Sequence, residues 1–153
     1  MSIEDNKRLV RRLYEETDKQ NFGAMDEFFS ADLIDHDPPP IPDLKPGLEG
    51  IKQAFKVFAS AYPDGTHVIH DLIAEGDRVV VRVSGTGTQT GEFKGIKPTG
   101  KKVEMTGIVI YRIEGGKIVE RWAQHNFLGF VMQQLGVVSL PGMSPHPHPD
   151  QPS

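Results

Sequence analysis

The residues best suited to acid–base chemistry stand together at Asp35, His36 and Asp37, directly before three consecutive prolines. Histidine titrates close to physiological pH, so His36 could exchange a proton while either aspartate orients its ring. The same residues could equally cap an extended loop, because the prolines that follow forbid a helix. No second group of metal-ligating residues accompanies them, and we therefore expect no metal site.

A row of polar side chains lies in the last predicted strand, at residues 117–127. Side chains alternate between the two faces of a strand, so Trp122 shares its face with four others: Ile118, Glu120, Gln124 and Asn126. Polar groups on a face covered by helices need a cavity, water or a ligand. If Trp122 points inward, we expect Gln124 and Asn126 to contact a substrate. His125 then faces away, towards a contact between subunits.

Arg82 is the charged member of a predicted strand at residues 78–90. Its guanidinium cannot be neutralised, so a buried Arg82 would need a carboxylate, such as Glu104 or Glu120, or an anionic ligand. An outward position in a surface stripe fits the sequence equally well. Arg82 is therefore a candidate substrate-binding residue with a purely structural alternative.

Three helices are expected to precede the sheet. Ser2 and Asp5 form a capping-box pattern, which predicts a helix over residues 3–19. Apolar residues spaced three or four positions apart predict two further helices, at residues 22–29 and 48–62. Phe55 and Phe58 belong to the apolar face of the third helix, so we expect them to contact a substrate.

After residues 63–65 the apolar pattern changes to alternation, which is typical of strands. Four strands are predicted, at residues 67–74, 78–90, 102–113 and 117–127. Short glycine-containing turns join the first two and the last two, and a loop at 91–101 joins the middle pair. Leu33 and Ile34 also allow a short strand. Helices followed by hairpin-linked strands predict an α+β fold with an antiparallel sheet.

Composition limits the class of protein. The chain has 153 residues, a size typical of one domain, and we expect a domain at residues 1–140 and a disordered tail rich in Pro and His at 141–153. Without cysteine, disulfides and thiolate chemistry are excluded. A net charge of −4 with mixed signs predicts no nucleic-acid partner. The N-terminus has no signal-peptide pattern and no segment reads as a membrane span, so a cytoplasmic location is expected.

Several segments together resemble the SnoaL-like polyketide cyclase (ester cyclase) family, over about residues 5–136. They comprise residues 33–38, 85–93, 98–103 and 116–122, with further matches at 128–129 and 133–136. The resemblance implies an NTF2-like cone, with three N-terminal helices packed on a curved antiparallel sheet, a largely apolar pocket and a dimeric or larger assembly. It also implies the intramolecular aldol closure of a polyketide ester without a cofactor.

Two positions depart from the family pattern. The resemblance implies that an aspartate four residues after Trp122 acts as the base, but Asn126 stands there and cannot accept a proton. It also implies that histidine is frequent at the position of Gln89. His36 and Asn126 are therefore the candidate catalytic residues. The candidate substrate-binding residues are Phe55, Phe58, Arg82, Gln89, Trp122 and Gln124.

The leading functional hypothesis is a cyclase or isomerase that acts on a small, apolar, carbonyl-bearing molecule. A non-catalytic protein that binds such a molecule in the same pocket is an alternative, and a hydroxylase on the same scaffold is another, because a fold does not determine a reaction. We expect no membrane partner. We also expect a homodimer built on the outward sheet face, where apolar residues would otherwise meet water: Val119, Ala123 and either Val109 or Ile110.

Overall fold

The computed structural model describes residues 2–130, 135, 136 and 141 of the chain. Helix α1 (Ile3–Asp18) begins at the predicted capping box, in which the Ser2 hydroxyl accepts from the backbone N–H of Asp5. A 3₁₀ turn and the short α2 (Met25–Phe28) follow, and α3 (Gly47–Ala61) completes the N-terminal helices. A last turn of helix, α4 (Phe127–Gly129), ends near Phe130.

The sheet has five strands: β1 (Phe29–Asp35), β2 (Thr66–Glu75), β3 (Arg78–Thr88), β4 (Lys102–Glu114) and β5 (Lys117–His125). Their spatial order is β1-β5-β4-β3-β2, so the four expected strands form successive antiparallel pairs. The sequence analysis missed one feature: the short strand at Leu33 and Ile34 extends over seven residues and pairs with β5 in parallel. This strand joins the sheet because it pairs with β5, which is distant in the sequence. A local residue pattern gives no information on such a partner.

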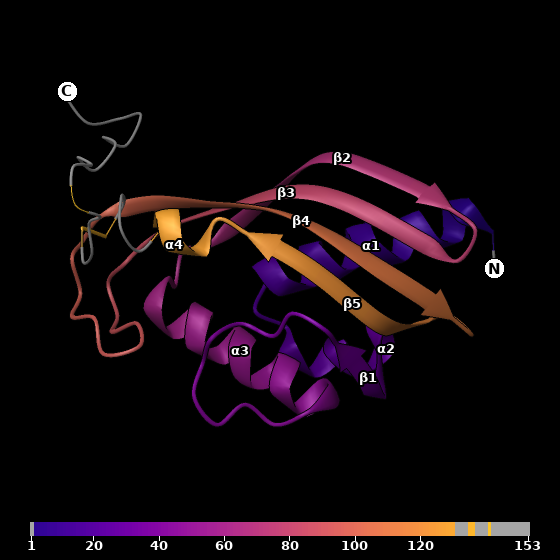
Figure 1. Cartoon of the computed structure of the whole chain (residues 1–153), viewed down its shortest axis with the longest axis horizontal. Helices are drawn as coiled ribbons and strands as arrows, with labels where there is room; N and C mark the ends of the chain where they lie inside the picture. The colour runs from indigo at the N-terminus through magenta and orange to yellow at the C-terminus, as the bar shows by residue number, and fades with distance from the viewer. Residues whose placement is uncertain (1, 131–134, 137–140, 142–153) are drawn as a thin grey trace.

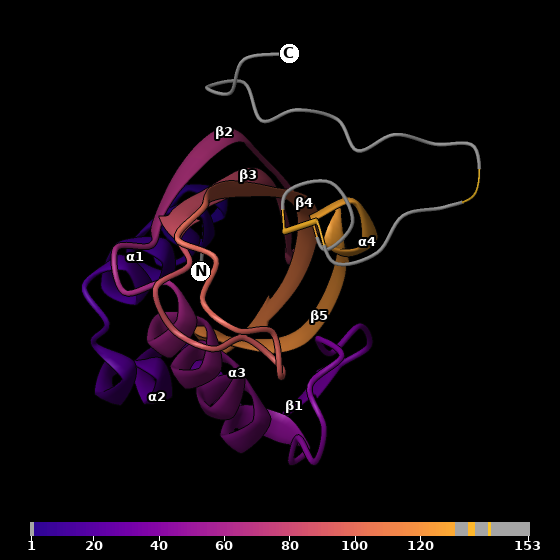
Figure 2. The ribbon, with the colours of Figure 1, turned by 90° about the vertical axis from the view of Figure 1, so that its left-hand side faces the viewer.

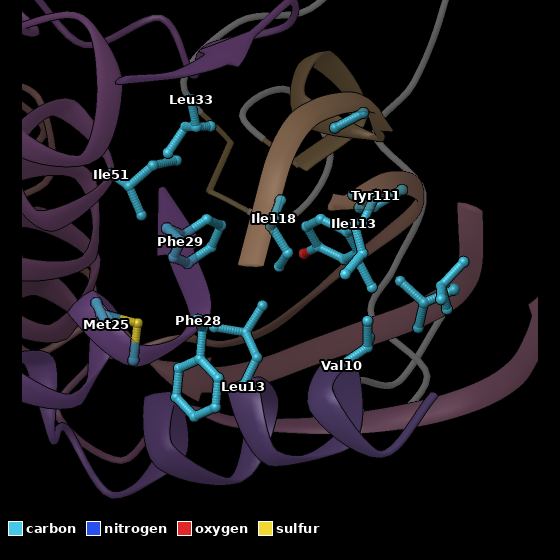
Figure 3. Close-up of a cluster of buried hydrophobic side chains, with 14 of the residues drawn as sticks. Val10, Leu13, Met25, Phe28, Phe29, Leu33, Ile51, Tyr111, Ile113 and Ile118 are labelled. Carbon is cyan, nitrogen blue, oxygen red and sulfur yellow. The ribbon is translucent and has the colours of Figure 1, made fainter. Parts of the chain in front are cut away.

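The sheet curls, and helices α1 and α3 lie on its concave side (Figure 1, Figure 2). Figure 3 shows the main core, in which buried side chains from helices α1 to α3 meet those of β1, β4 and β5: Val10, Leu13, Met25, Phe28, Phe29, Leu33, Ile51, Tyr111, Ile113 and Ile118. Each large apolar side chain buried in this way contributes about 1.5–3 kcal/mol. The α+β cone of NTF2-like proteins is therefore the fold of this chain.

Two bulges interrupt the regular alternation of the antiparallel strands. In β5, Ile118 pairs with Ile113 of β4 and Glu120 pairs with Arg112, so Val119 is an extra residue. In β2, His70 is extra in the same way. A bulge moves every later side chain of its strand to the opposite face from the one that alternation predicts. The bulge at Val119 therefore decides which residues of β5 face the concave side.

Among the described residues, no helix is long and apolar enough to cross a membrane. The predicted tail, residues 141–153, lies outside the described part of the chain except for Pro141.

Candidate active site

A cavity of about 410 Å³ lies between the concave face of the sheet and helices α1 and α3. Volumes of this size are usual for small-molecule sites. Its wall is mainly apolar and aromatic, with Leu13, Phe22, Phe29, Ile51, Phe55, Phe58, Tyr62, Val83, Phe127 and Phe130 among its residues. Phe55 and Phe58, which the sequence analysis expects to contact a substrate, are therefore in the cavity wall. The ring of Phe58 packs against Phe93 at 5.3 Å between centroids.

A histidine–carboxylate pair opens onto this cavity at the end of α1. The Asp18 carboxylate accepts from the backbone N–H of His67 at 3.1 Å and lies 2.6 Å from its ring Nδ1. An ionised carboxylate can only accept, so the ring proton resides on Nδ1 and the lone pair on Nε2 is left free. The edge of this ring lies over Gly85 of β3, where an added Cβ would come within 3.4 Å of Nε2. Asp18 thus orients an imidazole that can accept a proton.

Two tyrosine hydroxyls also face the cavity, one from α1 and one from β4. The hydroxyl oxygens of Tyr14 and Tyr111 are 2.9 Å apart, and the ring of Tyr14 packs against His67 at 5.3 Å. Burial raises the pKa of the Tyr14 hydroxyl well above its ordinary value. Burial also raises the pKa of Tyr111, although Arg121 beside it opposes the rise. Both hydroxyls therefore stay protonated: one donates to the other, and the second can donate a hydrogen bond to an oxygen in the cavity.

A buried ion pair supports the cavity floor. The Arg121 guanidinium donates from one nitrogen to both carboxylate oxygens of Asp35, at 3.0 and 3.1 Å, and to the backbone carbonyl of Asp37. The Asp37 carboxylate accepts from the backbone N–H of Ala123 at 2.8 Å. The loop after β1 is thereby fixed against β5. Asp35 and Asp37 therefore hold this loop against β5, whereas the sequence analysis considered them as partners of His36.

His125 is a further polar residue of β5 that lines the cavity. Its ring lies over Gly107 of β4, where an added Cβ would be 2.3 Å from Cδ2. Burial, followed by the positive charge of Arg121, lowers the pKa of His125 to about 4. The imidazole is therefore uncharged at neutral pH. The sequence analysis placed His125 on the opposite face, and the bulge at Val119 corrects that placement.

The same bulge reverses the expected orientation of the other β5 residues. Trp122 and Asn126 do not line the cavity, and Gln124 borders both the cavity and a separate pocket on the outer face, which also includes Asn126. Ala123, expected to face outward, is buried inside instead, as is Val109 of β4. Alternation was counted from Trp122 without the extra residue, and this is the physical reason for the error.

His36 lies on the outer face of the sheet. Its ring stacks on Trp122, with centroids 4.8 Å apart and planes within 7°, and its Nε2 is 2.8 Å from a carboxylate oxygen of Glu120. The hydrogen bond with His36 and that with Arg112 lower the pKa of Glu120. The expectation that His36 stands near the pocket mouth with Asp35 or Asp37 beside its ring is therefore wrong.

Arg82 and Gln89 have structural partners outside the cavity. Arg82 is half exposed on the outer face and pairs with Asp71 of the neighbouring strand, as the surface alternative predicted. Gln89 is fully buried and spans the loop after β3: its amide N–H donates to the carbonyls of Ile96 and Lys97, and its oxygen accepts from Thr99. Its side-chain amide is thus directed to that loop, and the cavity wall does not include it.

Sequence reasoning missed the pairing of Asp18 with His67 and the inward position of His125. The available signal was the glycines inside strands, since a glycine there often marks the close approach of another group. Gly85 accommodates His67 and Gly107 accommodates His125, and a Cβ added at Gly87 would lie 3.0 Å from Cβ of Tyr62. Among the described residues, no group of three or more potential metal ligands gathers.

Comparisons with known proteins agree with this architecture. The family model of the SnoaL-like polyketide cyclases matches residues 8–135. The structure of IdmH from Streptomyces antibioticus, a candidate polyketide cyclase, is 28% identical with a TM-score of 0.75, covering 86% of this chain and 99% of IdmH. A candidate polyketide cyclase from Bacillus cereus is 28% identical with a TM-score of 0.74, covering 88% and 83% of the two chains.

A protein with a different assigned activity shares the fold equally well. AclR from Streptomyces galilaeus, a candidate hydroxylase, is 25% identical with a TM-score of 0.79, and the match covers 92% of this chain and 91% of AclR. No curated protein sequence matches the chain significantly. Similarity of fold therefore leaves the choice of reaction to the chemistry of the cavity.

Proposed function

Because this chain belongs to the SnoaL-like polyketide cyclase family, we propose that its cavity catalyses cofactor-free acid–base chemistry on a small, apolar, carbonyl-bearing molecule. The reaction is of the intramolecular aldol type. The observation that carries this proposal is the Asp18–His67 pair, which opens onto the same cavity as the hydroxyls of Tyr14 and Tyr111. A base and hydrogen-bond donors on one apolar cavity are what enolate formation requires.

In the proposed reaction, Nε2 of His67 removes a proton from a carbon next to a carbonyl group. The electron pair of the C–H bond moves onto the carbonyl oxygen, and whichever hydroxyl of the Tyr14–Tyr111 pair does not donate to the other donates a hydrogen bond to the resulting enolate. The enolate carbon then attacks a second carbonyl carbon, whose π electrons form an alkoxide. The alkoxide takes a proton from water and the His67 imidazolium returns one to water, so the reaction is a net isomerisation without a co-reactant.

The expected contributions follow from the type of group. A positioned base contributes roughly 10²–10⁴-fold to the rate, and removal of one donor to an oxyanion costs roughly 10²–10³-fold. Arg121, held by Asp35, supports Tyr111 with its positive charge. Phe55, Phe58 and Gln124 contact the body of the substrate in this proposal.

Other candidate bases fit the reaction less well. A catalytic base works best with a pKa near the operating pH, whereas the pKa of His125 is about 4. His36 is committed to Trp122 and Glu120 on the outer face. Asn126 has no basic group, and the cavity wall does not include it. We therefore assign the base to His67 rather than to His36 or Asn126.

Exchange of a carbon-bound hydrogen for deuterium tests the base directly. β-Tetralone, a bicyclic ketone with an acidic carbon next to its carbonyl, is incubated with the protein in heavy water and followed by NMR. We expect the protein to accelerate the exchange, and His67→Gln to reduce that acceleration by about 100-fold or more. His70→Gln is the matched control, because this histidine of the same strand bonds to Ser84 on the outer face.

Three outcomes would contradict the proposal. An unchanged rate in His67→Gln would remove His67 from the mechanism, and a loss confined to His36→Gln would return the base to the outer face. If the wild-type protein binds β-tetralone without accelerating exchange, the cavity serves a non-catalytic binding protein instead.

A further inference from the structure

His125 is a cavity residue for which the mechanism above has no use. Its side chain is half-buried, and neither ring nitrogen forms a hydrogen bond with any residue that the structure describes. The edge formed by Cδ2 and Nε2 lies over Gly107, which has no side chain to displace it. A neutral imidazole always carries one N–H donor. A half-buried donor that no described residue accepts from is available to water or to the acceptor of a ligand in the cavity.

The surroundings of His125 keep it uncharged. Burial and the charge of Arg121 disfavour its protonated form, and the carboxylates of Asp35 and Asp37 only partly oppose them. Because its pKa is about 4, the ring is a neutral donor throughout the physiological range. A neutral donor is suited to a carbonyl oxygen, which needs a hydrogen bond but carries no full charge before the reaction.

The two cavity histidines lie over neighbouring positions of the sheet. Gly85, under His67, pairs with Met105, and Gly107, under His125, lies two residues further along β4. Such diagonal neighbours are about 7–8 Å apart. Both rings line the same cavity, so one small molecule can contact both of them.

We propose that His125 donates a hydrogen bond to the carbonyl group that the enolate attacks, so that the natural substrate is a dicarbonyl compound held between His67 and His125. This inference rests on the proposed function, because it names the second oxygen of that reaction. His125 makes and breaks no covalent bond. It polarises the carbonyl before attack and holds the alkoxide until water protonates it.

The test compares two ligands that differ by one carbonyl group, acetonylacetophenone and valerophenone, by isothermal titration calorimetry. One neutral hydrogen bond corresponds to about a 3- to 10-fold gain in affinity, so we expect the wild-type protein to prefer the diketone by that factor. His125→Leu, which has no donor, should bind both ligands equally. His125→Gln, which keeps an uncharged N–H donor, should retain the preference, as should the outer-face control His70→Gln.

A preference that persists in His125→Leu, or that is absent from the wild-type protein, would overturn the inference. Loss of the preference in both His125→Leu and His125→Gln would also overturn it, because ring shape rather than the donor would then be responsible. The binding test is independent of turnover. His67→Gln should keep the preference for the diketone. The exchange experiment therefore tests the role of His67, and the binding experiment separately tests the role of His125.

Discussion

Two histidine–carboxylate pairs lie on opposite faces of the same sheet and differ mainly in what surrounds them. On the concave face, His67 pairs with Asp18 at 2.6 Å, next to the Tyr14 hydroxyl. On the outer face, His36 pairs with Glu120 at 2.8 Å, and its side chain is 39% exposed. In one pair a free ring nitrogen faces a cavity, whereas in the other the ring is stacked on Trp122.

The difference shows that a histidine next to a carboxylate does not by itself indicate catalysis. Catalysis requires room for a ligand beside the imidazole and a hydrogen-bond donor for the negative charge that develops on that ligand. The outer pair does not line the cavity: Arg112 occupies the second oxygen of Glu120, and the indole ring covers one face of His36. We therefore expect the outer pair to act in stability and assembly.

The difference between the two pairs is tested most directly by neutralising each carboxylate in turn. Asp18→Asn leaves His67 without the acceptor that fixes its tautomer, and we expect deuterium exchange of β-tetralone to slow by roughly 100-fold. Glu120→Gln makes the same chemical change at His36 and should leave the rate unchanged. Equal losses in the two variants, measured by NMR at matched protein concentration, would show that the two pairs are equivalent.

Acid should lower the stability of the folded protein through His125, on the concave face. The folded protein binds a proton at His125 only near pH 4, whereas the unfolded chain binds it at about 6.5. The contribution of His125 to the free energy of unfolding is therefore fully present above about pH 6.5. It falls as the pH decreases towards 4, where roughly 3 kcal/mol has been lost. In urea denaturation, His125→Gln should lack this part of the loss. A pH dependence that is identical in the variant and the wild type would refute the role of His125.

The outer face should mediate a homodimer, because it exposes three large apolar side chains, Val68 at 53%, Ile73 at 62% and Ile108 at 51%. Light scattering at tens of micromolar protein should give the mass of a dimer. Ile108→Asp should weaken association by about 30-fold if Ile108 is central to the contact. Ile3→Asp, at an exposed isoleucine of α1, is the control and should leave the dimer intact. A wild-type monomer would reject this prediction.

The smallest effect is expected from a segment that belongs to neither face. Deletion of residues 141–153 should leave the melting temperature and the exchange rate nearly unchanged, because a sequence rich in Pro and His buries little apolar area. Differential scanning calorimetry of the shortened chain checks this. A melting temperature lower by several degrees would show that the tail packs against the domain.

Local signals were sufficient for the elements of the fold. The capping box at Ser2 correctly gave the start of α1, and the glycines of the hairpin turns adopt the positive φ that such turns need, as at Gly76 and Gly115. Alternation of apolar residues located β2 to β5 to within about two residues at most ends, which is the usual uncertainty of strand limits.

The site required information that no local pattern holds. Asp18 and His67 are 49 positions apart, and only the packing of α1 on β2 brings them together. The orientation of β5 depends on the extra residue at Val119, which is defined by its pairing with β4. The apolar residues Phe55 and Phe58 were located correctly because helical periodicity alone places them towards the sheet.

The bulge at Val119 has a consequence for how the cavity of this family could diversify. A substitution changes one position of the cavity wall. The pairing of β5 with β4 beyond Ile118, in contrast, decides which face of the sheet every later side chain of the strand takes. Deletion of Val119 would remove the bulge and leave Arg121 and His125 on the cavity side, because both would keep their partners in β4. If the bulge closed without the loss of a residue, the end of β5 would shift by one position against β4, and Trp122 and Gln124 would replace Arg121 and His125 on the cavity side. The pairing of this strand therefore determines the chemistry of the cavity wall as much as the identity of each side chain does.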